Sequence, residues 1–562
     1  MILEVVFEQI IPKVFGRMID LGIDAGNMNY VYKMGVILLG LAVLGLISGV
    51  AGGISAAYAS TGFAKNLRKA MNDKIQTYSF SNIDKFSTAG LVTRLTTDVT
   101  NIQNAYQMLL RMCFRAPISL VFAMCAAFFI NARLASVYLV AVAFLSVFLF
   151  FLVKTAMKYF TQVFKKYDDL NATIQENVKG IRVVKAFVRE EYETDRMKKA
   201  AGNIYKMFVK AENVVILNGP IMSLTIYSCI MVISYLGAKT VVAGELTTGE
   251  LMGLLTYCMA ILMNLMMLSM IFVMMSMSIA SAERISEVLG EEPDITNPEN
   301  PVMDIADGSI SFRDVEFTYN KDGNGDPVLK DIDLDIKSGE TIGIIGGTGS
   351  SKSTLVMMIP RLYDVTKGQV MVGGRDVREY DLTALRKDVA MVLQKNVLFS
   401  GTIFDNLRWG NKDASDEECI EAATLACANE FIEQMPDGYN TQISQGGTNV
   451  SGGQRQRLCI ARALIAKPKI LILDDSTSAV DTATDAKIRN ALMEKIPNTT
   501  KIIIAQRISS VEKADRIIVM DDGKIVGVGT HDELVASNDI YREVYESQTG
   551  ANADFDEVGK EA

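Results

Sequence analysis

The stretch TIGIIGGTGSSKSTLV, residues 341–356, combines a strand-like run, a turn rich in glycine and serine, and a helix start. Such a turn points backbone N–H groups inward, where they can hold phosphates. Lys352 adds a positive charge, and Ser353 adds a hydroxyl suited to Mg²⁺. The stretch therefore predicts a phosphate-binding loop in an α/β domain. The expected nucleotide-binding residues are Gly346, Gly347, Thr348, Gly349, Ser350, Ser351, Lys352, Ser353 and Thr354.

One position of this loop departs from the usual pattern. GxxxxGK[ST] expects glycine where Ser351 stands, so a Cβ is added beside the phosphates. The rest of the loop is intact, and nucleotide binding remains the prediction.

A second stretch, ILILDDSTSAVD at residues 470–481, runs from aliphatic residues straight into Asp474 and Asp475. A buried strand that ends on a carboxylate suits the holding of Mg²⁺ near a phosphate. The second acid is notable because the activation of water usually falls to a glutamate, which is one methylene longer.

A third stretch, VSGGQRQRLCIARALI from Val450 onward, places small residues where a helix begins. The free N–H groups and the dipole of a helix start form an anion site. It follows the phosphate loop by about 100 residues and precedes the strand at 470 by about 20, a highly specific arrangement. The residues expected to take part are Ser451, Gly452, Gly453 and Gln454.

The first half of the 562-residue chain is apolar, whereas the second half is typical of a soluble α/β domain. Stretches of membrane-spanning length occur at 34–59, 116–130, 134–153, 213–237 and 251–279. The first 23 residues are apolar but are interrupted by Glu4, Glu8 and Lys13. We expect them to be the outer part of a first span that is incomplete at its N-terminus.

Positive charge predicts the orientation of these spans. Residues 61–115 hold eight Lys and Arg and residues 154–210 hold thirteen, whereas the connections 20–33, 131–133 and 238–248 hold one each. The two basic segments are therefore expected to be cytoplasmic, and both are predicted to continue the spans as helices.

The remaining composition excludes several classes of site. The seven cysteines are scattered and His531 is the single histidine, which argues against a disulfide framework, a zinc site or a His-based triad. The net charge of −9 argues against a nucleic-acid partner.

The last span is dense in methionine, with seven residues within an arc of about 80°. They are Met252, Met259, Met263, Met266, Met270, Met274 and Met277. Methionine surfaces repack around varied apolar ligands. This face is interpreted either as a helix-packing face or as a face that lines the substrate path.

Together these features resemble a half-size ATP-binding cassette exporter, an all-α six-helix transmembrane domain followed by an α/β P-loop nucleotide-binding domain. We expect the transmembrane domain at 1–290, a Pro-rich acidic linker at 291–307, the nucleotide-binding domain at 308–548 and a disordered acidic tail at 549–562. Segments 84–99 and 176–197 resemble the two cytoplasmic loops whose coupling helices dock on nucleotide-binding domains.

The resemblance assigns roles to individual residues. Tyr319 matches the aromatic residue that stacks on adenine, and Gln394 matches the Q-loop glutamine, which senses Mg²⁺ and the γ-phosphate. Asp474 matches the aspartate that helps to hold Mg²⁺. Asp475 stands where the family has the catalytic glutamate, and Gln506 stands where it has the switch histidine.

Four positions depart from the family pattern: Ser351, Gln445 in place of a glutamate, Asp475 and Gln506. Aspartate is short for a general base, and a displacement of about 1 Å can cost roughly 10²-fold in rate. Glutamine can hydrogen-bond a phosphate but cannot carry a proton. We therefore expect a site that binds ATP and hydrolyses it slowly.

In this family two nucleotide-binding domains enclose two ATP molecules, each between one phosphate loop and the other domain's signature helix. The resemblance therefore implies a heterodimer in the cell membrane that exports a small amphipathic or lipid-like compound. A second half-transporter would supply the missing glutamate and histidine. Two alternatives remain, a homodimer with slow ATP turnover and an ATP-binding regulatory or channel-like subunit.

Overall fold

The computed structural model describes residues 1–320, 325–476 and 478–558. The chain divides into a helical unit, Met1–Gln76 with Ser87–Glu291, and an α/β unit, Thr77–Phe86 with Glu292–Ala562. The two units match the two expected domains in their order along the chain.

Two boundaries differ from those expected. Residues 77–86 group with the α/β unit because their side chains bond to it: Tyr363 Oη donates to Asp84 at 2.6 Å. The expected linker 291–307 is also largely part of the α/β unit, and Ile295 and Ile305 in it are buried. The prolines and acidic residues of this segment suggested a linker that packs against neither domain. Its two buried isoleucines instead anchor it to the α/β unit.

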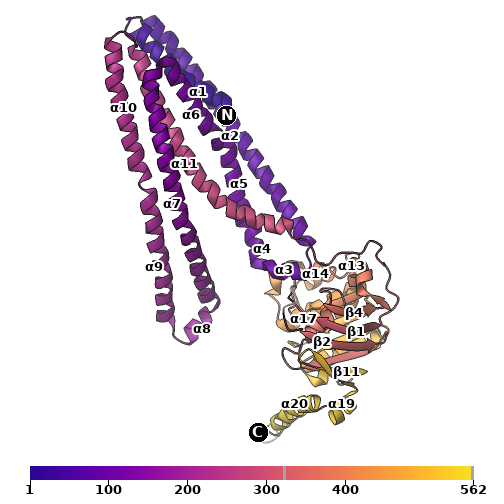
Figure 1. Ribbon diagram of the computed structural model, residues 1–562. Coiled ribbons are helices and arrows are strands. Elements are labelled where there is room, and N and C mark those ends of the chain that lie inside the picture. The colour runs from indigo at the N-terminus through magenta and orange to yellow at the C-terminus, as the bar shows by residue number, and fades with distance from the viewer. Residues whose placement is uncertain (321–324, 477, 559–562) are drawn as a thin grey trace. The chain divides into compact units, whose positions relative to one another are not determined.

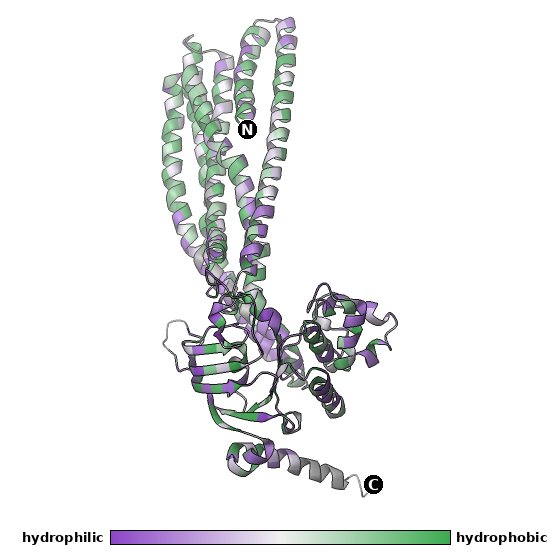
Figure 2. Cartoon of the chain, turned by 90° about the vertical axis from the view of Figure 1, so that its right-hand side faces the viewer, coloured by the Kyte–Doolittle hydropathy of each residue, from purple (hydrophilic) through white to green (hydrophobic). Residues whose placement is uncertain are grey.

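The helical unit consists of long helices arranged side by side (Figure 1). The helices are mostly hydrophobic along the part of the bundle that contains α1 and become more hydrophilic toward the opposite end (Figure 2). Their bounds are α1 Ile2–Met18, α2 Met28–Gln76, α4 Thr88–Thr93, α5 Val99–Met108, α6 Arg115–Ile130, α7 Ala132–Lys179, α8 Ile181–Ala186, α9 Glu190–Val215, α10 Asn218–Val242 and α11 Thr248–Gly290. Short π-helical turns lie at η1 Ile19–Ile23, η2 Arg94–Asp98 and η3 Leu109–Cys113.

Five of the described helical stretches are long and apolar enough to cross a membrane. They are Met28–Gln76, Thr88–Ile130, Ala132–Phe160, Glu190–Val242 and Thr248–Leu268. Four of the expected spans fall within these stretches, and the fifth, 251–279, lies within α11 but extends past Leu268. Helices α2 and α7 continue beyond membrane length, as predicted for the two basic segments. Helix α11 does the same, which was not predicted. The shorter α1 packs against α2 and α11 and contributes a sixth helix to the unit.

Helix α11 is anchored at both ends. At its start, Asp20 accepts a hydrogen bond from Gly249 N at 2.7 Å and another from Thr247 Oγ1 at 2.8 Å. A Cβ built on Gly249 would lie 2.0 Å from Gly16 O, so α1 and α11 touch through backbone. Toward its other end, Arg284 binds the buried carboxylate of Asp98, with Nε 2.8 Å from Oδ2.

The α/β unit contains a four-stranded sheet in the order β2-β1-β4-β5 and a six-stranded sheet in the order β12-β11-β3-β10-β9-β6. In the larger sheet β12 is antiparallel and the other strands are parallel. The strands are β1 Ile310–Phe317, β2 Leu329–Ile336, β3 Thr341–Gly346, β4 Lys367–Val372, β5 Arg375–Asp376, β6 Val389–Val392, β9 Ile470–Asp474, β10 Thr500–Ile504, β11 Arg516–Asp521 and β12 Lys524–Gly529. A further pair joins β7 Gly401–Thr402 to β8 Gln442–Ile443.

The central strands β9 and β10 are buried along their whole length, because the larger sheet is covered on both faces. The helices of this unit are α3 Phe80–Phe86, α12 Lys352–Met357, α13 Leu382–Asp388, α14 Ile403–Leu407, α15 Asp416–Leu425, α16 Asn429–Ile432, α17 Gly452–Ile465, α18 Thr482–Lys495, α19 His531–Ser537 and α20 Asp539–Val558. Their 3₁₀ turns are η4 Val377–Glu379, η5 Gly438–Asn440, η6 Gln445–Gly447 and η7 Ile508–Ser510.

Helix α20 extends to Val558 and so reaches into the expected tail 549–562. The stretch contains no proline, which would end a helix, although Gly550 disfavours one. The disorder of the tail stays a prediction. Residues 559–562 lie outside the described part of the chain.

Candidate nucleotide-binding site

The phosphate loop joins the buried strand β3 to α12. A Cβ on Gly346 would lie 2.1 Å from Met520 O, so no other residue fits there. A Cβ on Gly347 or Gly349 would meet no atom within 4 Å, so these two residues face open space. A loop with N–H groups beside open space at the start of a helix suits a bound phosphate.

Ser351 retains the backbone conformation of the glycine that the pattern expects. Its φ is 70° and its ψ is 22°, in the left-handed region. A residue with a Cβ pays roughly 1–2 kcal/mol for this conformation. The departure at Ser351 therefore leaves the shape of the loop unchanged and introduces strain instead.

Lys352 folds back over the loop that precedes it. Its Nζ donates to Gly346 O at 2.8 Å and to Gly347 O at 2.7 Å. Burial lowers the pKa of Lys352, and the carboxylates of Asp474 and Asp475 act in the opposite direction. The ammonium group is thus held at the mouth of the loop, facing two acids.

Asp474 ends β9 and is 1% exposed. Its Oδ1 accepts a hydrogen bond from Ser353 Oγ at 2.9 Å, while its buried Oδ2 has no hydrogen-bond partner among the described residues. Burial raises the pKa of this carboxyl group, and the neighbouring Asp475 raises it further. An orphaned carboxylate oxygen beside a hydroxyl, with a loop for phosphate nearby, fits Mg²⁺, a hard cation with oxygen ligands.

Asp475 is hydrogen-bonded by Gln506, whose Nε2 donates to Asp475 Oδ2 at 2.8 Å. Burial is the largest influence on Asp475 and raises its pKa, and the side chains of Gln394 and Gln506 act against that rise. The φ of Asp475 is 46°, a conformation that aspartate tolerates better than most residues.

Tyr319 lies at the edge of the same site. Its hydroxyl is 3.0 Å from Thr354 Oγ1, and its ring meets those of Phe317 and Tyr363 edge-on. The side chain is 50% exposed. An aromatic ring that is fixed at its hydroxyl and open to solvent can stack on a nucleotide base.

The signature residues lie at the start of α17, the kind of helix start that can bind an anion. Ser451 and Gln454 make a capping box, with Gln454 N 3.3 Å from Ser451 Oγ and Ser451 N 2.9 Å from Gln454 Oε1. A Cβ on Gly453 would lie 2.8 Å from Ala479 O, so glycine is required. Among the described residues, no hydrogen bond joins Ser451–Gln454 to the phosphate loop.

Two further glutamines support these sites and were not predicted. Gln548 of α20 donates to Gln506 O at 2.8 Å and accepts from Ile508 N at 2.9 Å, so it holds the segment that carries Gln506. Gln456 accepts from Ala479 N at 2.9 Å and ties α17 to the segment after Asp475. Both are ordinary helix residues in the sequence, and only the fold reveals their contacts.

The sequence matches two protein families. Residues 1–278 match the ABC transporter transmembrane region, and residues 329–478 match the ABC transporter family.

Similar proteins come from several bacteria. The uncharacterized ABC transporter ATP-binding protein YfiB of Bacillus subtilis is 36% identical over 550 residues, 98% of this chain and 95% of that protein. The ATP-dependent lipid A-core flippase of Syntrophus aciditrophicus is 32% identical over 88% of this chain and 82% of that protein. A solved bacterial Atm1-family ABC exporter with ATP bound shares the fold, with a TM-score of 0.81, 24% identity and coverage of 97% and 96%.

The first prediction concerns Asp474→Asn. At neutral pH the buried carboxyl group of Asp474 destabilises the fold, because its pKa is raised above the ordinary value of 3.8. Asparagine should therefore raise the melting temperature of the nucleotide-free protein at pH 7 and leave it unchanged below pH 3.8, where the carboxyl is protonated anyway. It should also remove most of the extra stabilisation that Mg²⁺ adds to ATP, measured by thermal unfolding.

Asp485→Asn is the matched control for this experiment. Asp485 is also buried but is paired, 3.1 Å from Arg489 Nη2 and 2.9 Å from Ser510 Oγ. Its neutralisation should destabilise the protein by about 3–5 kcal/mol. A fall in melting temperature for both variants would contradict the assignment of Asp474 as an unsatisfied carboxylate.

The second prediction concerns Gln548→Leu. Loss of two hydrogen bonds, each worth about 1 kcal/mol, should speed amide hydrogen exchange in residues 506–511 by roughly tenfold or more. Mass spectrometry of the full chain measures this directly. Ser547→Ala, the neighbouring change, should leave the exchange unchanged, and equal exchange in Gln548→Leu and wild type would exclude the positioning role.

Proposed function

The chain belongs to the ABC transporter family, as an exporter half-transporter with one transmembrane region and one nucleotide-binding domain, and we propose that it works as one half of a heterodimer. In that heterodimer it contributes a degenerate ATP site and an intact signature. The complex moves an amphipathic or lipid-like compound outward across the membrane. The lipid A-core flippases among its relatives support the substrate class.

ATP binding uses residues that this chain retains. The N–H groups of the phosphate loop and the ammonium of Lys352 hold the phosphates, and Tyr319 stacks on the base. Ser353 and Asp474 would hold Mg²⁺, which when bound neutralises the charge that develops on the phosphates. To receive the phosphates, Lys352 must leave the carbonyl groups of Gly346 and Gly347.

Slow hydrolysis follows from the pair formed by Asp475 and Gln506, the observation on which the proposal depends. A general base has to accept a proton from water and pass it on. The shorter Asp475 cannot reach as far as a glutamate, and one of its oxygens already accepts from Gln506. Gln506 in turn has no proton to exchange near neutral pH.

The signature supports the need for a partner. Ser451, Gly452 and Gly453 keep the open helix start and the capping box that an anion site requires. In the ABC sandwich this site completes the ATP site of the other subunit. We propose that the other subunit supplies a glutamate and a histidine, so that hydrolysis takes place there while the degenerate site retains ATP for longer.

The third prediction tests this asymmetry. The isolated chain should hydrolyse ATP slowly, and the double variant Asp475→Glu with Gln506→His should raise turnover at least tenfold without tightening ATP binding. Steady-state phosphate release from the purified protein measures the effect. Brisk hydrolysis by the unmodified chain would support the homodimer instead, and no gain in the double variant would show that other residues limit the rate.

The fourth prediction places the signature in the partner's site. In the double variant, Ser451→Arg should abolish most ATP turnover while leaving ATP binding at the chain's own phosphate loop intact. The arginine would occupy the helix start where a phosphate belongs.

Ser415→Arg is the matched control, because Ser415 caps α15 with the same capping box to Glu418. The loss of either cap costs about 1 kcal/mol. Only the change at Ser451 should stop ATP hydrolysis. Equal losses of ATP turnover in the two variants would mean that the loss comes from a destabilised helix and not from a blocked phosphate site.

A further inference from the structure

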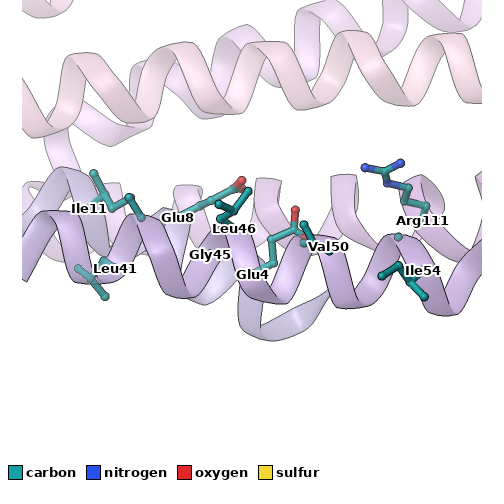
Figure 3. A pocket seen from close by; sticks show the side chains of 12 residues that line it. Glu4, Glu8, Ile11, Leu41, Gly45, Leu46, Val50, Ile54 and Arg111 are labelled. Carbon is teal, nitrogen blue, oxygen red and sulfur yellow. The ribbon is translucent and has the colours of Figure 1, made fainter.

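A cavity of about 600 Å³ opens in the helical unit between α1, α2 and η3. One wall is the apolar, glycine-rich face of α2, which includes Gly45, Gly49 and Gly53. The other side carries Glu4, Glu8 and Arg111, and Figure 3 shows these three charged side chains along the α2 residues. The cavity is thus apolar on one side and charged on the other.

This cavity lies at membrane depth. Ten residues separate Glu8 from the end of α1 at Met18, and fifteen separate Arg115 from the end of α6 at Ile130. At 1.5 Å per residue these groups are about 15 Å and 22 Å from the helix ends. The ends of α1 and α6 lead into the connections 20–33 and 131–133, which hold one basic residue each and are expected to lie outside the cell. The hydrocarbon layer is about 30 Å thick. Glu8 and Arg115 therefore lie inside this layer, in its cytoplasmic half.

The charges in and beside the cavity are not fully paired. Arg115 serves both acids, with Nη2 2.6 Å from Glu8 Oε1 and Nη1 3.4 Å from Glu4 Oε1. Arg111 forms no ion pair or hydrogen bond with any described residue. Within the described part of this chain, the Arg111 guanidinium therefore has no counter-ion, and the carboxylates of Glu4 and Glu8 share the single cation of Arg115.

Unpaired charge is expensive at this depth, and ionisable residues there mark sites of function. The charges of Glu4, Glu8, Arg111 and Arg115 sum to zero. A bound anion alone, or a bound cation alone, would therefore leave a net charge in the membrane. A molecule that carries both charges would pair Arg111 and the acids together. The glycine face of α2 would receive its apolar part, since Gly45 and Gly53 leave open space.

We infer that this cavity binds a zwitterionic amphiphile, with its anionic group on Arg111, its amine on Glu4 and Glu8, and its chain along α2. The inference rests on the proposed export function, because it names the class of compound that the exporter takes from the cytoplasmic half of the bilayer. Gly49 also suits this site, because a Cβ there would lie 3.1 Å from Glu4 Oε1 and glycine leaves room for the carboxylate.

The test is binding of pyrene-labelled lipids to the detergent-solubilised full chain without nucleotide. Phosphatidylethanolamine, which has an amine beside a phosphate, should bind at least tenfold more tightly than phosphatidylglycerol or a cationic alkylammonium lipid. Arg111→Gln should weaken its binding by roughly tenfold to a hundredfold, the range for hydrogen bonds to charged groups. Glu4→Gln should narrow the preference for phosphatidylethanolamine over phosphatidylglycerol.

Two controls separate this site from general effects. Arg133→Gln removes an exposed arginine of the same unit away from the cavity and should leave binding unchanged. Gly45→Leu should block the cavity, whereas Gly35→Leu, also on α2 with no atom within 4 Å of its Cβ, should not.

Equal binding of the anionic or cationic lipid, or unchanged binding in Arg111→Gln and Gly45→Leu, would overturn the inference. Because no nucleotide is present, such a failure leaves the ATP turnover of the double variant at 475 and 506 as a separate test of the proposed function.

Discussion

The buried carboxylate of Asp474 is the constraint around which the nucleotide-binding site is organised. It ends β9, the strand that pairs with β10 and β6 in the middle of the larger sheet, and it binds Ser353 at the start of α12. This hydrogen bond joins the phosphate loop to the edge of the sheet where the strands terminate. Burial of this carboxyl group raises its pKa and so disfavours its charged form. A cation bound there would offset that cost, in line with the proposed Mg²⁺ site.

The neighbouring Asp475 shows how the proposed degenerate site is held in place by its own residues. In an active site of this family a glutamate and a histidine would hold the attacking water between them. Here the shorter acid and Gln506 bind each other, and Gln548 holds the segment behind Gln506. Asp475, Gln506 and Gln548 therefore form a continuous set of contacts, which is compatible with the proposal that this site retains its nucleotide.

Sequence patterns predicted most of the fold because they reflect local chemistry. The phosphate loop, the strand into Asp474 and the helix start at Ser451 each follow from residues close together in the chain, and the long apolar stretches determine the spans. Contacts between distant residues were not predictable. No local pattern marks Gln548 as the partner of Gln506. The family resemblance implied that a segment from residue 84 onward docks on a nucleotide-binding domain, but no local pattern shows that the segment grouped with the α/β unit is 77–86. The left-handed backbone of Ser351 was also missed, because the sequence suggests an obstructed loop where the structure has a strained one.

The two anchors of α11 have a mechanical consequence. At the Thr248 end, glycine backbones in direct contact and the carboxylate of Asp20 leave α11 little freedom to slide along α1. At the other end a bidentate arginine grips Asp98, which belongs to a neighbouring helix. A helix fastened in this way moves as a stiff rod together with the helices at its two anchors, so a displacement at one end reaches the other. The methionines of α11 that the structure shows as exposed, Met252, Met259, Met263, Met266, Met270 and Met274, lie between these anchors and would move with it.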